Sequence, residues 1–377
     1  MTARIRVAFI HDSYPEYRRP LFARLMERYD LRCFFLNENP AELPPRSESV
    51  RAWRIPEMSD FIVAPSLAGR LWAAHRRESF DVVCCPEPAS FSALAAGRFA
   101  RRIGRPYVVF SGEWYPARHP RRALTFGLER DLVRGAACCL AYGTRVRERL
   151  ERMGVDSGRI LVTGNASPYA FSPAPMEDIV AIRREWSIGD KPVVLFLGRL
   201  MSFKAPDVLV KAFSLLHRET AAFLLIAGSG PLREELAGQA RRLGLDDVRI
   251  TGREVRGAAE KNLLYSLARV FVLPSRRGRT AEPWGLVINE AASAALPIVT
   301  TDGVGAAGDL IRDGDTGRVV PSGDPRARAS AILGFLQAPD TARACGERAR
   351  GQAARFTIER MADAFGAAFE RAAGGGR

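Results

Sequence analysis

The chain has 377 residues, of which 47% are apolar and 26% charged, and this is enough for two domains with separate cores. No apolar run is long enough for a signal peptide or a membrane-spanning helix, so we expect a cytoplasmic protein. The formal net charge of +14 is nearly all arginine and forms no long basic tract. Because no nucleic-acid recognition motif accompanies that charge, we expect no nucleic-acid partner.

Short, continuous apolar runs alternate with helix-like amphipathic stretches in both halves of the sequence. Such continuous runs are typical of strands buried on both faces of a parallel sheet. The first half has runs at 5–12, 31–38, 81–88, 106–113, 137–143 and 159–165, and the second half has runs at 192–200, 222–230, 248–252, 269–275, 297–302 and 317–321. The predicted helices are 20–29, 91–102, 145–153, 207–217, 232–243 and 286–295, with a last one near 358–369.

Two β/α series in tandem predict an α/β protein with two Rossmann-like domains. The break falls in the proline-containing stretch 165–178, which gives domains at 1–172 and 173–354. We expect a C-terminal helix at 355–373 to complete the first domain. Since ligands of open parallel sheets bind at the carboxyl ends of strands, we expect the active site in a cleft between the domains.

The first motif with chemical meaning is GRLMSFK, residues 198–204, between a predicted strand and a predicted helix. Gly198 allows a sharp turn at the strand end, after which Arg199 and Lys204 are expected to point into the cleft. Two cations there suit a diphosphate that gains negative charge as it leaves. Solvated loop charges are the alternative interpretation.

The second motif, EPWGLVINE, places Glu282 and Glu290 eight positions apart on either side of a predicted helix start. The amides of Gly285, Leu286 and Val287 would form a helix N-terminus, which is an anion site for phosphate. Glu290 would then accept hydrogen bonds from ribose hydroxyls, and Glu282 from the hydroxyls of a donor sugar. The alternative is a capped, solvated helix with incidental acids.

A third motif, AGSGPLREEL at 227–236, is a glycine-rich turn that suits close approach to a ligand. The full G-x-G-x-x-G pattern of nicotinamide cofactor sites is absent after the first strand. The six cysteines have no C-x-x-C spacing, and we expect them to be buried and free. The four histidines have no zinc spacing, so neither a metal nor a cofactor is predicted.

In their order, these motifs resemble the retaining glycosyltransferases of the GT-B fold, specifically the family 4 group, also described as glycosyl transferases group 1. The resemblance rests on GRL…K, LLIAGSGPLREEL, RITGREV, VFVLPS, EPWGLVINEAASAALPIVTTD and GDLIRDGDTGRVVPSGD, all in the C-terminal half. It implies transfer of a hexosyl or amino-hexosyl group from a nucleoside-diphosphate sugar to a hydroxyl-bearing acceptor, which could be a glycan, a lipid-linked acceptor or a small molecule. It also implies retention at the anomeric carbon and independence of metal.

The resemblance also assigns residues of the C-terminal half to parts of the donor. Catalytic roles fall to Arg199, Lys204 and Glu282, at the diphosphate and the transferred sugar. The remaining donor contacts would be made by Gly198 at the turn, Arg253 and Val255 beside the base, Trp284 at the sugar, Gly285, Leu286 and Val287 at phosphate or ribose, and Glu290 at the ribose. A UDP-sugar is favoured over a GDP-sugar on the frequency of donors in the group.

The N-terminal half would bind the acceptor, and it departs from the family pattern in two places. Family members often have two glycines after the first strand, where this chain has HDSYPEYRR. Many members also have a histidine after the fourth strand, where this chain has Ser111. The acceptor-side candidates are His11, Arg18, Arg19, Glu113 and His119, and the alternative is that the leaving phosphate itself takes the acceptor proton.

Two other functions share some of these features. A sugar-nucleotide epimerase of the same two-domain architecture also binds nucleoside diphosphates, although the Glu-x7-Glu element and the GR…K loop favour transfer. Basic residues mixed with apolar ones at 66–80 and 118–130 also suggest peripheral contact with the inner face of an anionic membrane. A core-facing helix with a solvated basic side is the alternative for those stretches.

Overall fold

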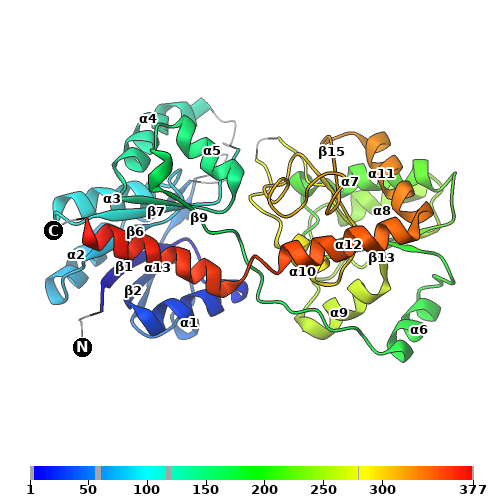
Figure 1. The fold of residues 1–377 in the computed structure, drawn as a ribbon, viewed down its shortest axis with the longest axis horizontal. Coiled ribbons are helices and arrows are strands. Elements are labelled where there is room, and N and C mark those ends of the chain that lie inside the picture. Colours follow the sequence, from blue (N-terminus) through cyan, green and yellow to red (C-terminus); the bar gives the residue numbers. More distant parts are fainter. Residues whose placement is uncertain (1–3, 56–60, 116–119, 279, 376–377) are drawn as a thin grey trace. The chain divides into compact units, whose positions relative to one another are not determined.

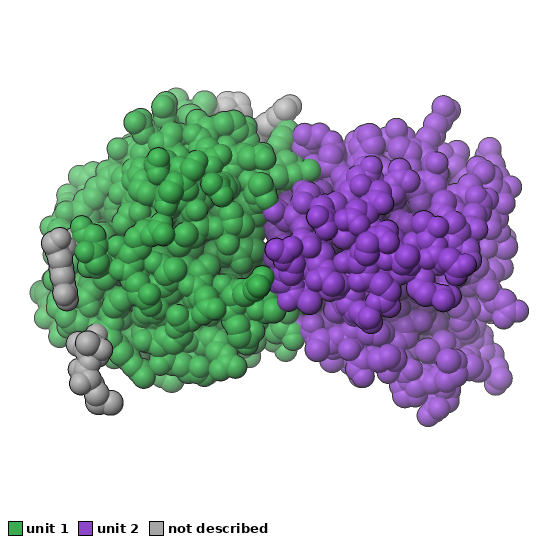
Figure 2. Space-filling view, viewed as in Figure 1, with its two compact units in different colours: residues 1–168, 357–377 green, residues 169–356 purple. Residues whose placement is uncertain are grey.

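The computed structural model describes residues 4–55, 61–115, 120–278 and 280–375. The chain forms two compact units: unit 1 consists of Met1–Pro168 and Thr357–Arg377, and unit 2 of Tyr169–Phe356 (Figure 2). Each unit has a parallel sheet with helices packed against it (Figure 1). The predicted α/β class is confirmed.

Unit 1 contains a seven-stranded parallel sheet in the order β3-β2-β1-β6-β7-β8-β9. Its strands are β1 (Arg6–His11), β2 (Asp30–Leu36), β3 (Ser47–Val50), β6 (Val82–Cys85), β7 (Tyr107–Ser111), β8 (Cys138–Ala141) and β9 (Ile160–Val162), with a small antiparallel pair, β4 (Trp53–Arg54) and β5 (Ile62–Val63). Its helices are α1 (Arg19–Arg28), α2 (Leu67–Arg77), α3 (Phe91–Arg102), α4 (Pro120–Gly135), α5 (Thr144–Arg152) and α13 (Ile358–Gly374), with 3-10 turns η1 (Glu16–Arg18), η2 (Pro40–Glu42) and η3 (Ser157–Arg159). The six runs of the first half are confirmed as strands.

Alternate residues of the unit 1 strands enter two separate cores, as the pleat requires. Val7 and Phe9 of β1 pack with α1 and α13 on one face of the sheet. Ala8 and Ile10 pack with α2, α3, α4 and α5 on the other face. Because both faces are covered, nearly every strand position is apolar, which explains the continuous runs in the sequence. The C-terminal helix α13 lies beside α1 (Figure 1).

Unit 2 contains a six-stranded parallel sheet in the order β12-β11-β10-β13-β14-β15. Its strands are β10 (Val193–Leu197), β11 (Phe223–Ala227), β12 (Val248–Ile250), β13 (Ala268–Leu273), β14 (Ile298–Thr301) and β15 (Arg318–Val320). Its helices are α6 (Met176–Glu185), α7 (Pro206–Leu216), α8 (Arg233–Arg242), α9 (Gly257–Leu267), α10 (Leu286–Ser293), α11 (Pro325–Gln337) and α12 (Pro339–Ala353), with the 3-10 turn η4 (Ser202–Lys204). The six runs of the second half are also confirmed as strands.

The strand order of unit 2 reverses at β10, which pairs with β11 on one side and with β13 on the other. In open parallel sheets, such a switch point leaves a crevice at the carboxyl ends of the two central strands. The loops that follow β10 and β13 are in direct contact there, since the Arg276 amide donates to the Phe203 carbonyl at 2.8 Å.

All six cysteines are buried and free, as predicted. Burial raises the pKa of the Cys33 and Cys139 thiols to about 12, so these two side chains behave as small apolar groups. Within the described ranges, no helix is long and apolar enough to cross a membrane.

Candidate functional site

The centre of the candidate site in unit 2 is an ion pair between the loops after β10 and β13. Lys204 Nζ lies 2.5 Å from Glu282 Oε2, and the two side chains are only 12% and 10% exposed. Ser275 Oγ also donates to Glu282 Oε2, at 3.3 Å. Arg199, from the same loop as Lys204, is exposed. The structure thus brings together Lys204 and Glu282, and it leaves Arg199 accessible beside the strand end.

The backbone of Glu282 is fixed by the segment that follows β14. Its amide donates to the Gly303 carbonyl at 3.2 Å, and the Gly305 amide donates to the Glu282 carbonyl at 2.9 Å. This pairing holds the acid at the carboxyl end of the sheet although Glu282 lies in a loop. A carboxylate held at low exposure next to an ammonium interacts more strongly with it than in water.

Gly285 begins α10 in a backbone conformation that favours glycine. Its φ is 91°, and a Cβ at this position would lie 2.6 Å from Leu273 Cδ2. The Ile288 amide donates to the Gly285 carbonyl at 2.8 Å, which leaves the Leu286 and Val287 amides at the helix N-terminus. Anions are stabilised at such a terminus by the amides and by the helix dipole.

Glu290 lies in the second turn of α10 and is bound by two side chains of α9. Lys261 Nζ is 2.7 Å from Oε1, and the Tyr265 hydroxyl donates to Oε2 at 3.0 Å. Burial, followed by the charge of Glu290, raises the pKa of Tyr265 well above its ordinary value, so this hydroxyl remains a donor. Sequence reasoning did not find Lys261 or Tyr265, although their spacing of four residues puts them on one face of a helix.

The glycine-rich turn after β11 packs against the loop after β10 rather than standing open. A Cβ on Gly228 would lie 1.9 Å from the Gly198 carbonyl oxygen, and one on Gly230 would lie 2.6 Å from that of Leu200. The Leu200 amide donates to the Ser229 carbonyl at 2.8 Å. These glycines therefore position the loop that carries Arg199 and Lys204.

Three other predicted donor residues have contrasting environments. Arg253 is exposed, and its Nη1 lies 2.5 Å from Glu260 Oε1, while Val255 is half-buried after β12. Trp284 is only 1% exposed, its indole nitrogen donates to Asn289 Oδ1 at 2.8 Å, and its ring packs against a phenylalanine. The Trp284 indole therefore points into the interior of unit 2, where it stabilises the loop before α10.

Three of the acceptor-side candidates, His11, Arg18 and Arg19, lie at the end of β1 or in the segment that follows it, and their environments differ. His11 Nδ1 is 2.7 Å from the Ser13 carbonyl oxygen, and burial, with the charge of Arg18, lowers the pKa of His11 to about 4. Arg18 is buried and donates to the Tyr142 hydroxyl at 2.6 Å and to Met361 Sδ. Arg19 is exposed on α1. His11 is thus neutral at physiological pH. Arg18 stabilises the interior of unit 1 through its contacts with Tyr142 and Met361.

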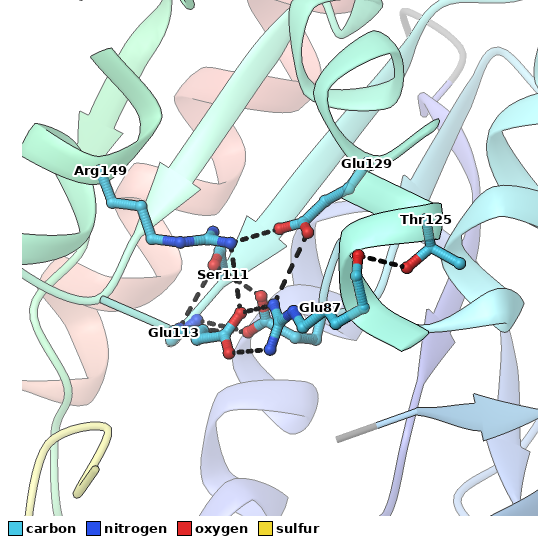
Figure 3. Close-up of polar contacts among 8 residues, drawn as sticks. Glu87, Ser111, Glu113, Thr125, Glu129 and Arg149 are labelled. Carbon is cyan, nitrogen blue, oxygen red and sulfur yellow. Dashed lines mark hydrogen bonds and ion pairs between the residues drawn. The ribbon is translucent and has the colours of Figure 1, made fainter. Parts of the chain in front are cut away.

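Glu113, after β7, belongs to a buried cluster of charged side chains (Figure 3). It forms a bidentate ion pair with Arg122 of α4, and its Oε2 lies 3.4 Å from Arg149 Nη2 of α5. Arg149 also lies 2.5 Å from Glu129 Oε1. Both carboxylate oxygens of Glu113 are thus engaged by guanidinium groups, so the geometry favours a structural role for this side chain.

Glu87, which follows β6, is the member of this cluster that contacts the end of β7. It accepts hydrogen bonds from the Ser111 hydroxyl at 2.7 Å, the Gly112 amide at 2.8 Å and the Glu113 amide at 3.2 Å (Figure 3). Burial, with the nearby Glu113 charge, raises the pKa of Glu87 to about 8, while the bonds from Ser111 and Gly112 oppose this shift. Sequence reasoning missed Glu87. Its position two residues after the buried strand β6, at the carboxyl end of the sheet, could have identified it.

His119 lies outside the described residues. Among the described side chains, no three of His, Cys, Asp or Glu gather in a way that could hold a metal ion.

Two Rossmann-like units, the second with a cationic loop and a helix N-terminus at the carboxyl ends of its strands, are typical of the GT-B fold. A solved structure of HepE from Anabaena in complex with UDP is similar, with a TM-score of 0.77 at 18% identity, covering 96% of this chain and 99% of that one. The predicted GT-B fold is confirmed.

The chain belongs to the glycosyl transferases group 1, whose family model matches residues 178–352. The model of the Glycosyl transferase 4-like domain matches residues 11–166. The chain is 33% identical over 302 residues to a GDP-mannose-dependent alpha-(1-6)-phosphatidylinositol monomannoside mannosyltransferase of Mycolicibacterium smegmatis, covering 76% of this chain and 75% of the relative. It is 30% identical over 277 residues to the alpha-D-kanosaminyltransferase of Streptomyces kanamyceticus, covering 70% of each. The protein is a glycosyltransferase, and the epimerase alternative finds no support among these relatives.

Proposed function

We propose that the protein is a retaining glycosyltransferase that moves a hexosyl or amino-hexosyl group from a nucleoside-diphosphate sugar to a hydroxyl of its acceptor. The observation that carries this proposal is the Lys204–Glu282 ion pair at the switch point of unit 2, next to the N-terminus of α10. An ammonium and helix amides suit a diphosphate, and a carboxylate suits sugar hydroxyls.

In the proposed reaction, the bond between the anomeric carbon and the diphosphate oxygen breaks while the acceptor oxygen forms a bond on the same face. The leaving phosphate oxygen takes the proton of the acceptor hydroxyl, so no side chain of unit 1 has to act as base. Arg199 and Lys204 stabilise the charge that develops on the diphosphate. The bidentate pairing of Glu113 with Arg122 is consistent with this assignment. Analysis of the product anomer tests retention, and an inverted product would contradict it.

We also propose that transfer needs no divalent metal, because cationic side chains and helix amides already supply the positive charge that a metal would provide. Turnover with an excess of chelator tests this proposal directly. We expect the rate to stay unchanged, and activity that disappears with chelator and returns with magnesium or manganese would contradict it.

For the donor base, we propose uridine, with guanosine as the competing candidate. HepE was solved with UDP, whereas the mycobacterial relative is named for GDP-mannose. Arg253 and Val255 are the residues proposed to lie beside the base. A thermal-shift screen against UDP, GDP and ADP and their sugars separates the candidates. We expect UDP to raise the melting temperature most, and a larger shift with GDP would assign guanosine.

For the acceptor side, we propose a hydroxyl of a lipid-linked glycan, reached by peripheral contact with an anionic membrane. Helix α4 supports this proposal, since Leu124 is 83% exposed and Phe126 and Leu128 are also exposed. Helix α2 does not, because Leu67 and Leu71 are fully buried and face the core. Vesicle co-sedimentation is the test, with phosphatidylglycerol compared with phosphatidylcholine. Leu124→Glu should reduce binding to the anionic vesicles, and equal binding by this variant would contradict a role for α4.

A further inference from the structure

Glu290 is held at both of its carboxylate oxygens by side chains from one face of α9. Lys261 Nζ contacts Oε1 at 2.7 Å, and the Tyr265 hydroxyl donates to Oε2 at 3.0 Å. Because each oxygen has its own donor, the plane of the carboxylate is fixed as well as its position. α9 and α10 are separate elements of unit 2, so these two contacts couple the orientation of Glu290 to the position of α9.

The two donors also differ in charge and exposure. The Lys261 side chain is 27% exposed, whereas that of Glu290 is 7% exposed, so the carboxylate is nearly enclosed while the ammonium reaches solvent. Burial of a charged side chain is costly unless an opposite charge or a hydrogen-bond donor lies beside it. Tyr265 is buried and uncharged, so Lys261 supplies the positive charge of this pair.

Lys261 is itself positioned by Tyr169. The ammonium lies 5.3 Å from the centroid of the Tyr169 ring, and the Tyr169 hydroxyl donates to Asn262 Oδ1 at 2.5 Å. An ammonium over an aromatic face is attracted by the ring quadrupole. The lysine is therefore bound between a carboxylate and an aromatic ring, which restricts the rotamers of a side chain that is otherwise flexible.

We propose that Lys261 is a positioning residue for the ribose of the donor, because it holds the Glu290 carboxylate oriented toward the vicinal ribose hydroxyls. This inference rests on the proposed function, in which Glu290 accepts hydrogen bonds from the ribose. Without Lys261, Oε1 of the enclosed carboxylate loses this donor, so the side chain can change its rotamer and then accepts hydrogen bonds from the ribose less well.

A readout specific to this role is the discrimination between ribose and 2′-deoxyribose. The deoxy form lacks one of the two hydroxyls, so it gains less from a well-oriented carboxylate. A lysine that only stabilised the fold would affect the binding of both nucleotides by the same factor. The ratio of their dissociation constants therefore separates a positioning role from a structural one.

The experiment is a calorimetric titration of the full chain with UDP and with 2′-deoxy-UDP, or with the corresponding guanosine pair if GDP binds more tightly. For Lys261→Met, we expect the affinity for the ribonucleotide to fall about tenfold, the size of one hydrogen bond to a charged group, and that for the deoxynucleotide to fall clearly less. Lys261→Arg should keep most of the ribose preference, because it keeps the charge.

Lys211→Met is the matched control, since Lys211 is exposed on α7, a helix that carries none of the donor residues discussed above. Lys261→Gln, which keeps a polar head group, replaces Lys261→Met if the latter fails to fold. An unchanged ratio of ribo to deoxy affinity in the folded Lys261 variants would overturn the inference. If the wild-type protein binds none of these diphosphates, the proposed function itself fails, and this result needs no variant to be recognised.

Discussion

Replacement of Lys204 by methionine removes the ammonium at the switch point of unit 2 and keeps the length of the side chain. In the structure, this ammonium lies 2.5 Å from Glu282 and is 12% exposed, so it acts in surroundings less polar than bulk water. The loss of one pre-oriented donor to a developing negative charge costs about 2.7–4 kcal/mol in the transition state, or about 10²–10³ in kcat. We therefore expect Lys204→Met to lower kcat by at least about 10² and to change the KM of the donor much less.

The assay is the release of nucleoside diphosphate from the sugar nucleotide that the thermal-shift screen selects, with saturating donor. Circular dichroism and the melting temperature establish that the variant is folded. Lys211→Met controls for the loss of a lysine elsewhere in unit 2 and should keep wild-type kcat. A folded Lys204→Met variant whose kcat stays within about twofold of the wild type would refute the role of Lys204 at the leaving group.

Three further substitutions test the energetics of the fold and the sites. Gly285→Ala should lower the free energy of unfolding by about 1–3 kcal/mol, because the φ of Gly285 is 91° and its new Cβ would collide with Leu273. Gly189→Ala is the control for backbone strain alone, since Gly189 has a φ of 60° and open space around it. Equal losses of stability in the two variants would contradict the steric argument. Glu87→Gln should remove a pH dependence of the free energy of unfolding. The raised pKa of Glu87 stabilises the wild type below about pH 4.5, and this contribution is lost as the pH rises through about 8. Urea denaturation of both proteins at pH 5 and pH 8 is the test, and an equal change in the wild type and the variant between the two pH values would disprove it. Arg328→Met should raise the free energy of unfolding by about 1–3 kcal/mol. Arg328 is fully buried, and none of its guanidinium nitrogens has a hydrogen-bond partner among the described residues. A variant that is less stable than the wild type would contradict this prediction.

Most strands of both sheets could be predicted because a strand buried on both faces is a continuous apolar run in the sequence. Runs such as 193–197 and 223–227 are apolar at every position, and each ends at a glycine whose backbone the following loop needs. β3 was missed for the same physical reason: it lies at the edge of the unit 1 sheet, and Ser47–Val50 has a single apolar residue.

The candidate donor residues could be named because each follows a strand, and the carboxyl ends of parallel strands lie at one edge of the sheet. The partners of these residues could not. Lys261 and Glu290 are 29 positions apart, and Glu113 and Arg149 meet through the packing of α5 against β8 and β9. Pairing between charges on different elements depends on side-chain direction, which hydrophobic periodicity does not encode. The inward direction of the Trp284 indole was missed for the same reason.

The most direct test of the donor site is a calorimetric titration of the wild-type protein with UDP, GDP and the free nucleosides, in the presence of chelator. If Arg199, Lys204 and the amides of α10 hold the diphosphate, one of the two nucleotides binds at least about 100-fold more tightly than its nucleoside, and added magnesium does not change the affinity. Equal binding of nucleotide and nucleoside, or binding that appears only with a divalent metal, would contradict this assignment.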